Sequence, residues 1–412
     1  MAQLEVSFNQ EEILQLLFMD RDAAFQKLLT IILNKILRAE SEEQLKATPW
    51  ERTAERTDSR NGFRDRGLVT RIGSITLRVP RHRNQPFRTL IFDNYSRSEA
   101  ALVAAMAEMV VCGVSTRKIA KIMEKLCGTT YSKSAVSALC RELDKPVEDF
   151  RNRMLTGQYP FVTVDATYFK VRENHRVVSK AFMIACGTNE QGVREVIGFG
   201  VYPRETADTW TDFLKSLRKR GLTGALMFTS DAHEGILKAI SRVYPDVPWQ
   251  RCQFHFARNI IDKTPKKYQI GLRTELQEMF SSASLREAMK KRDEIIADYR
   301  DIAESAMICL EEGFESCMTA RVFSDGIYRN YRTSNHLERL NRELKKRSRV
   351  IGVFMNETSL LRLMGSVLIE AHERIQTGRK MFSPAAYSAL SVPELTAKLK
   401  QMAEEQRMLL AA

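Results

Sequence analysis

The apolar residues of this 412-residue chain follow a helical period in its first and last parts and a strand period in its middle. Residues 10 to 47 predict a helix with one apolar stripe. The stripe consists of Phe25, Leu28, Leu29, Ile32 and Ile36. Because no partner sheet is evident nearby, we expect this stripe to pack on a neighbouring helix or on a second subunit.

Residues 99 to 150 carry two helical repeats separated by a short turn. Their apolar positions are Ile119, Ile122, Met123 and Leu126, followed by Val136, Leu139, Cys140 and Leu143. Ser115 caps the first helix and Gly128 ends it, which predicts a helix-turn-helix unit. Its second helix would turn four polar side chains toward phosphates or base edges: Lys133, Ser134, Ser137 and Arg141. An ordinary helical hairpin is the alternative.

The spacing becomes strand-like from Phe161 onward. The segments FVTVDATYFKV, RVVSKAFMIACG and VREVIGFGVYP predict three antiparallel strands. A helix around Trp210, the strand GALMFTSD, the helix EGILKAISRVY and a short strand near WQRCQFH follow. The order βββαβαβ predicts a mixed sheet covered by helices, which is the order of a ribonuclease-H-like α/β core.

Charge changes this picture by pointing to a partner. The chain has 64 Lys and Arg against 51 Asp and Glu, a formal net charge of +13, which favours a polyanion such as nucleic acid. Residues 51 to 98 are rich in arginine around the strand pattern GSITLRVP, and we expect DNA contacts from Arg64, Arg66, Arg78 and Arg81. A solvated basic face is the alternative for this region.

Composition excludes several classes of protein. The 44% hydrophobic content is too high for a disordered chain. The first residues lack the basic and apolar regions of a secretory signal, and no apolar run approaches the roughly 20 residues that span a bilayer. Seven scattered cysteines do not form a disulfide framework. We therefore predict a cytoplasmic protein.

Asp165 stands in the middle of the strand FVTVDATYFK, where aspartate is strongly disfavoured. If the first and fourth strands are neighbours, Asp165 lies beside Asp231, which ends LMFTSD. Two adjacent carboxylates repel each other, and a divalent cation removes that repulsion. Asp231 also has an ordinary explanation as the N-cap of the next helix, with Glu234 completing a capping box.

Glu338 begins a charged face of a predicted helix in SNHLERLNRELKKRSR. Helical spacing puts Arg342, Lys345 and Arg349 on its face, which suits a metal ligand beside a bound phosphate backbone. We expect DNA contacts along this helix from Arg339, Arg342, Lys345, Lys346 and Arg349. The alternatives are a salt-bridged surface helix, and a capping box in which Asn335 is the cap and Glu338 its partner.

These segments together resemble the Mutator-type insertion-sequence transposases of bacteria. The resemblance runs in order from about residue 50 to beyond residue 360, through RNGFRDRGLVTRIGSITLRVPR, VDATYFKVR, SDAHEG, WQRCQFHFARN and SNHLERLNRELKKRSRVIGVF. It implies a ribonuclease-H-like catalytic domain with a DDE triad formed by Asp165, Asp231 and Glu338, each of which matches its motif.

The resemblance also implies the chemistry. The triad would hold two Mg²⁺ ions, with Mn²⁺ as the natural substitute, and would use water and then a DNA 3′-hydroxyl as nucleophiles. Double-stranded DNA with terminal inverted repeats, a target DNA and a homodimer or higher homo-oligomer are the implied partners. Elements of such families are thought to move through a copied-out circular intermediate.

The predicted organisation has seven parts and is multidomain and mainly helical. Residues 1–50 form a helical region, 51–98 a small basic β region, 99–150 the helix-turn-helix unit, and 158–256 the first part of the core. Residues 257–330 form a helical insertion, because the interval between Asp231 and Glu338 far exceeds the usual link of about 4 to 6 residues. The last core helix at 331–355 and a helical region at 356–412 follow.

Trp249, Cys252 and His255 belong to a further motif, WQRCQFH. Two ligands at the C-x-x-H spacing do not make a structural zinc site by themselves. The motif looks like a Mutator signature, which implies a role near the active site or in holding DNA. Trp249 would stack on an unpaired base or belong to the core.

Two other functions compete with the transposase interpretation. A helix-turn-helix regulator without catalysis would keep all its activity after Asp165→Asn. A ribonuclease-H-like nuclease would cut DNA without needing the paired ends of an element.

Overall fold

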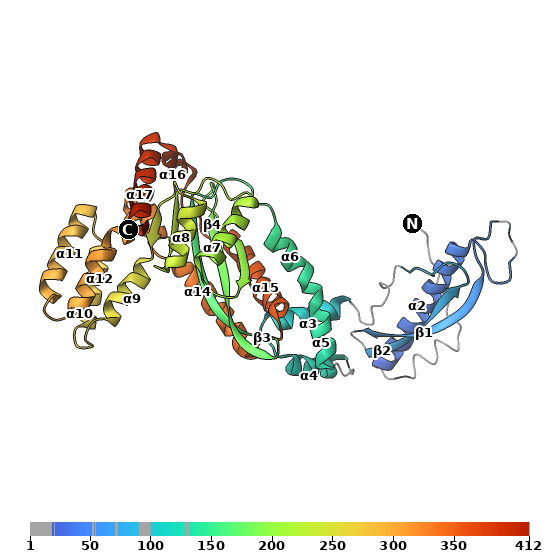
Figure 1. Ribbon diagram of the computed structural model, residues 1–412. Coiled ribbons are helices and arrows are strands. Elements are labelled where there is room, and N and C mark those ends of the chain that lie inside the picture. The colour runs from blue at the N-terminus through green and yellow to red at the C-terminus, as the bar shows by residue number, and fades with distance from the viewer. Residues whose placement is uncertain are drawn as a thin grey trace. The chain divides into compact units, whose positions relative to one another are not determined.

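The computed structural model describes residues 19, 21–51, 53, 55–70, 73–89, 100–127 and 132–411. The chain forms two compact units, residues 1–142 and 143–412 (Figure 1). The beginning of the predicted first helix, the predicted helix end at Gly128 and the side chains of Lys133 and Ser134 lie outside the described residues.

The first unit contains a long helix packed on a β-hairpin. Helix α2 (Arg21–Leu45) covers strands β1 (Arg60–Thr70) and β2 (Gly73–His82), which pair in antiparallel register. Leu29, Leu33 and Leu37 of the helix pack against Leu68, Ile75, Leu77 and Val79 of the hairpin. The expectation that this helix has no partner sheet was wrong, because the alternating apolar residues of β2 supply one, while Phe25 of the predicted stripe is exposed.

Helices α3 (Ala100–Val111), α4 (Thr116–Cys127) and α5 (Lys133–Leu139) complete the first unit. Met106, Ile119, Met123 and Val136 form their shared core. Ser115 caps α4 by accepting a hydrogen bond from the Lys118 amide, as predicted. The second predicted helix is shorter than its apolar spacing indicated, because a 3-10 turn, η1 (Cys140–Leu143), follows Leu139.

The second unit is built on one mixed sheet of five strands in the order β5-β4-β3-β6-β7. These strands are β3 (Phe161–Glu173), β4 (Arg176–Thr188), β5 (Arg194–Tyr202), β6 (Met227–Ser230) and β7 (Trp249–Arg251). The first three are antiparallel, as predicted, and β6 and β7 run parallel to β3. The expected neighbours β3 and β6 are therefore adjacent.

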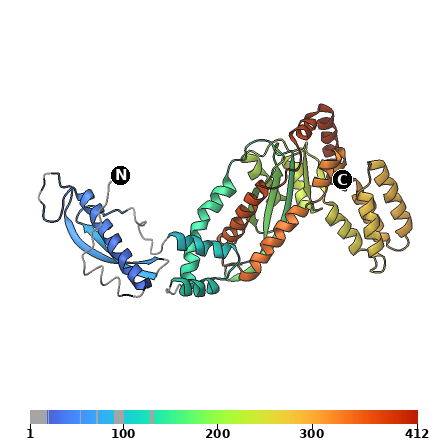
Figure 2. The ribbon, with the colours of Figure 1, turned by 180° about the vertical axis from the view of Figure 1, so that it is seen from behind.

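Helices cover both faces of this sheet. Helices α7 (Ala207–Lys219) and α8 (Glu234–Val243) lie over the face toward the viewer in Figure 1. Their apolar residues pack with Val162 and Val164 of β3. Seen from behind in Figure 2, α14 (Asn335–Ile351) and α15 (Glu357–Gln376) cover the other face. The predicted apolar residues of α15 are all buried, namely Leu360, Leu363, Met364, Val367 and Leu368.

Alternation along β3 decides which side chains meet which helices. Val162 and Val164 join the α7 and α8 face, whereas Phe161 stacks on Tyr331 of α13 (Asp325–Tyr331) with ring centroids 4.1 Å apart. Asp165 has the same parity as Phe161, so it belongs to the face that α14 covers. The Asn341 side chain of α14 indeed contacts it.

A group of helices with its own core separates β7 from α14. It comprises α9 (Gln253–Asp262), α10 (Gln269–Phe280), α11 (Leu285–Tyr299) and α12 (Glu304–Cys317), shown in yellow and orange in Figure 1. Ser284 caps α11 by accepting from the Glu287 amide, as predicted. The turn η2 (Thr319–Val322) leads from this group to α13.

The remaining elements surround the sheet. Helix α6 (Asp144–Asn152) is fixed to α15 by a bidentate ion pair between Arg362 and Asp144, at 2.7 and 2.8 Å. Helix α16 (Pro384–Ser388), turn η3 (Ala389–Ser391) and helix α17 (Pro393–Ala411) end the chain. Among the described residues, no helix has both the length and the apolar character needed to span a membrane.

Candidate active site

Adjacent strands bring the two predicted aspartates together. In the parallel pair of β3 and β6, Thr163 lies opposite Thr229. Asp165 and Asp231 each follow two residues later, so both stand at the carboxyl edge of this strand pair. The prediction that the fold makes them neighbours is confirmed by this register.

The surroundings of Asp165 disfavour its ionised form. Burial and the Asp231 carboxylate raise the pKa of Asp165 to about 7, although its bond from the Ala166 amide acts in the opposite direction. The Asn341 side-chain amide donates to Asp165 Oδ2 at 2.8 Å. A nearby cation would offset both the burial and the repulsion, which is the arrangement expected of a metal ligand.

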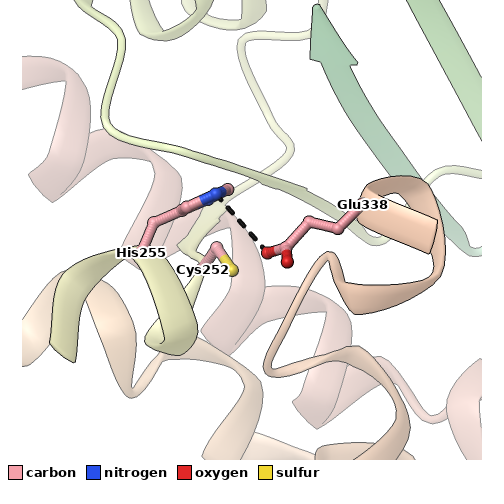
Figure 3. Close-up of side chains that lie close together, drawn as sticks. All are labelled: Cys252, His255 and Glu338. Atoms are coloured by element: carbon pink, nitrogen blue, oxygen red, sulfur yellow. Dashed lines mark ion pairs between the residues drawn. The ribbon is translucent and has the colours of Figure 1, made fainter. Parts of the chain in front are cut away.

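Glu338 reaches the same place from α14. Asn341, which binds Asp165, lies three residues after Glu338 and thus on the same helix face. Glu338 Oε1 is buried and has no hydrogen-bond partner among the described residues. His255 Nε2 lies 3.4 Å from this oxygen (Figure 3). A buried carboxylate oxygen without a donor suits a cation ligand.

Neither helix cap that competed with these roles is present. Helix α8 is capped by His233, whose ring nitrogen accepts from the Gly235 amide at 3.2 Å, and Glu234 pairs with Lys238 instead. Helix α14 is preceded by Ser334, which makes no side-chain cap bond. The capping alternatives for Asp231 and Glu338 were therefore wrong.

The C-x-x-H motif lies directly beside Glu338. Figure 3 shows Cys252, His255 and Glu338 together, with one potential ligand atom of each within 4.8 Å of the others. Interaction with Cys252 raises the pKa of His255, burial lowers it, and Glu338 and Asp165 raise it further, with a net increase. These interactions favour the protonated form of His255 beside the carboxylates. Spacing alone did not predict that Glu338 joins this motif.

Trp249 belongs to the core, the second of the two roles considered for it. It is 8% exposed and packs among the residues beneath α7 and α8. Its indole nitrogen donates to Ser230 Oγ at 2.9 Å. Ser230 directly precedes Asp231, so Trp249 supports the strand end that carries this carboxylate.

The predicted cationic face of α14 is open to solvent. Its exposed members are Arg339, Arg342, Lys345, Lys346 and Arg349. Leu337, Leu340 and Leu344 are buried on the opposite side of the helix. Glu343 is occupied by an ion pair with Arg347 at 3.0 Å. The helix thus extends a row of cations away from Glu338.

The predicted DNA contacts of the first unit are also largely exposed. Arg64, Arg78 and Arg81 are exposed on the hairpin and Arg66 is half-buried. The Arg78 guanidinium lies 5.0 Å from the centre of the Phe63 ring. After α4, Ser137 and Arg141 are exposed.

Sequence reasoning missed two polar residues at the site. Asn341 could have been found, because it lies one turn after Glu338. Glu205 could not have been found, because it lies in the loop before α7, where no motif or periodicity marks it. Burial raises the pKa of Glu205, His233 opposes this, and the Asp231 carboxylate adds to the increase.

Carboxylates gathered beside two adjacent parallel strands, next to a row of exposed cations, are typical of metal-dependent enzymes that act on phosphate esters. Comparison with known proteins gives the family. The family model "Transposase, Mutator family" matches residues 1–378, and the chain belongs to this family.

Individual relatives agree over most of their length. The chain is 38% identical over 385 residues to the transposase for insertion sequence element IS256 in transposon Tn4001 of Staphylococcus aureus, covering 92% of this chain and 98% of that protein. It is 37% identical to the ISRM5 transposase of Rhizobium meliloti over 348 residues, 84% and 87% of the two chains. It is 35% identical to the IS1081 transposase of Mycobacterium tuberculosis over 355 residues, 86% of each.

Proposed function

We propose that this protein is the DNA transposase of an insertion sequence, with Asp165, Asp231 and Glu338 as a DDE triad on a ribonuclease-H-like core. The observation that carries the proposal is the β3–β6 register, in which each aspartate follows the last strand pair by two residues, together with the Asn341 bond that brings the Glu338 helix to Asp165. Membership of the Mutator family supports the same activity.

The residues fit divalent magnesium. Mg²⁺ prefers oxygen ligands and is usually held by one or two carboxylates together with substrate phosphates and water. The donors here are the carboxylates of Asp165 and Asp231 and the Glu338 oxygen Oε1, which accepts no hydrogen bond among the described residues. Asp165, Asp231 and Glu338 would hold two Mg²⁺ ions, with Mn²⁺ as a substitute.

The two bound cations would activate the nucleophile and stabilise the leaving 3′-oxygen. Asp165 is oriented by the side-chain amide of Asn341, which donates a hydrogen bond to it. In hydrolysis a water oxygen bonds to phosphorus as the bond to the 3′-oxygen breaks, and in strand transfer a DNA 3′-hydroxyl takes the place of water. No covalent bond to the protein forms in either step.

The cationic residues are assigned to the DNA backbone. The exposed row on α14 begins one position after Glu338, so a strand bound along it would bring a phosphate toward the carboxylates. The hairpin arginines and the region around α5 are assigned to the terminal inverted repeats. We further propose a homodimer or higher oligomer that pairs two ends, and a circular intermediate produced by copying.

Asp165→Asn tests the proposal directly. The variant is expected to bind terminal-repeat DNA with the affinity of the wild-type protein, but not to nick it in Mg²⁺ or Mn²⁺. Asp208→Asn is the matched control, because Asp208 is an exposed aspartate paired with Arg242 on the surface. Nicking by Asp165→Asn at the wild-type rate would refute the triad.

The competing functions give different outcomes. A regulator would bind DNA without metal-dependent nicking even as the wild-type protein. A general nuclease would cut scrambled ends as readily as cognate ends. Imperfect inverted repeats flanking the reading frame are expected for the transposase alone.

A further inference from the structure

The connection along the chain does not by itself set the distance between Asp231 and Glu338. Between the end of β7 and the start of α14 lie four helices with their own hydrophobic core, followed by η2 and α13. Any movement of that group would be transmitted along the chain to the start of α14. The position of Glu338 must therefore be set by contacts that bypass the inserted helices.

Cys252 makes such a contact on both sides. Its backbone amide donates to the Ser230 carbonyl at 2.7 Å, directly before Asp231. Its sulfur accepts two hydrogen bonds from Ser334, from the backbone amide at 3.3 Å and from the hydroxyl at 3.2 Å. Ser334 directly precedes α14. One fully buried residue thus joins the strand end of Asp231 to the helix start of Glu338.

Two further hydrogen bonds join the same parts of the chain. The Thr229 hydroxyl donates to the Tyr331 carbonyl at 3.1 Å, and the Gln253 amide donates to the Arg332 carbonyl at 3.0 Å. Unlike these two bonds, the bonds of Cys252 are made with Ser334, the last residue before α14. One turn further along α9, His255 faces Glu338 itself.

We propose that Cys252 is a positioning residue, which sets the distance between Asp231 and Glu338 through its hydrogen bonds with Ser334. The inference rests on the proposed two-cation chemistry and adds to it a role for the cysteine of the C-x-x-H motif. The sulfur accepts from the Ser334 amide and hydroxyl, and it also interacts with the His255 side chain. Buried residues that orient metal ligands affect metal affinity and rate without touching the substrate.

Cys252→Ala removes the acceptor and leaves the buried Ser334 amide without a partner. The half-saturating Mg²⁺ concentration for nicking is expected to rise, and the maximal rate to fall, by about 10-fold or more, since loss of such partners typically costs about 10- to 100-fold. Affinity for terminal-repeat DNA in Ca²⁺ is expected to stay unchanged. Cys252→Ser, whose oxygen still accepts hydrogen bonds, is expected to restore part of both losses.

Cys317→Ala is the matched control. Cys317 is equally buried, and its thiol donates to the Phe314 carbonyl within its own helix. Ser334→Ala perturbs the same contact from the other side, and it serves if Cys252→Ala fails to fold. In the variant that combines Cys252→Ala with Ser334→Ala, the second substitution is expected to cause no further loss, because the first has already removed the hydrogen bond.

The outcomes separate this inference from the proposed function. If the wild-type protein nicks in Mg²⁺ but Cys252→Ala and Ser334→Ala match Cys317→Ala in Mg²⁺ dependence, the positioning role is refuted and the triad stands. If wild-type nicking does not depend on Asp165, both proposals fail. One zinc ion per purified chain, absent from Cys252→Ala, would also overturn the role and make Cys252 a metal ligand.

Discussion

The carboxylate site of the second unit and the basic hairpin of the first unit use charge in opposite ways. At the site, Asp165 and Asp231 are held together by strand register, and burial with mutual repulsion raises the pKa of Asp165 to about 7. On the hairpin, Arg64, Arg78 and Arg81 stand exposed on two strands whose apolar residues pack against α2.

The two regions therefore differ in how well they tolerate substitution. A site in which each group depends on its neighbours loses function when one member is altered, and such losses do not add. Exposed cations that bind phosphates contribute separately and in small amounts. The predictions below test whether this contrast between a cooperative site and an additive surface holds.

The largest effect is expected from Glu338→Gln. Glutamine keeps the size of the side chain but is a weaker cation ligand, and loss of several kcal/mol of transition-state stabilisation corresponds to about 1000-fold in nicking rate. Single-turnover nicking of end DNA measures it. Glu343→Gln, five residues later on the same helix and paired with Arg347, is the control. Equal rates for the two variants would break the contrast.

Asp165→Asn should stabilise the metal-free protein at high pH. Because the pKa of Asp165 rises from 3.8 to about 7 on folding, the folded state binds this proton more tightly. The ionised group therefore costs stability that is absent at pH 4, grows between pH 4 and 7, and is complete at pH 8. Since Asp165 is partly exposed, the gain is about 1 to 3 kcal/mol at pH 8.

Chemical denaturation in the presence of a chelator measures this gain. Near pH 4 the variant and the wild-type protein are expected to have similar stability, and Asp208→Asn should show no such pH-dependent difference. A variant that is less stable than the wild-type protein at pH 8 would mean that the ionised Asp165 carboxylate does not destabilise the metal-free folded state.

Sequence patterns predicted the parts of the site that obey local rules. Asp165 was identifiable because aspartate in the middle of a strand lacks a local explanation. Its adjacency to Asp231 followed from the order of strands, and the register confirms it. Glu338 was identifiable from its helix face and from the family resemblance. The exposed row on α14 followed from helical spacing.

Contacts between segments that are far apart in the sequence could not be predicted from it. The Ser334–Cys252 and Asn341–Asp165 bonds join residues that no periodicity relates. The same limit explains the error at α2, whose stripe was assigned without its partner hairpin. Local rules also overextended the helix at α5, because apolar spacing continues through a 3-10 turn. Residues 1–18 and the division into seven parts remain predictions.

On α14, Arg342→Ala should weaken DNA binding moderately. Arg342 is exposed and lies one turn beyond Glu338, so it is expected to contribute one phosphate contact. The slope of log affinity against log salt should fall by about 0.9, with a several-fold loss of affinity at low salt. Fluorescence anisotropy over a salt series measures both. Lys290→Ala, an exposed lysine of the inserted helices paired with Glu294, is the control.

Arg64→Ala on the hairpin is expected to have the smallest effect, about twofold in affinity, because it removes one of several separate phosphate contacts. The diagnostic result is additivity: Arg64→Ala and Arg78→Ala together should multiply their separate losses, as independent exposed sites do. Leu77→Ala gives a structural reference, because it removes a fully buried contact between the hairpin and α2. If one arginine substitution abolished binding, the hairpin would be a cooperative site like that of Asp165, and the contrast between the two regions would be false.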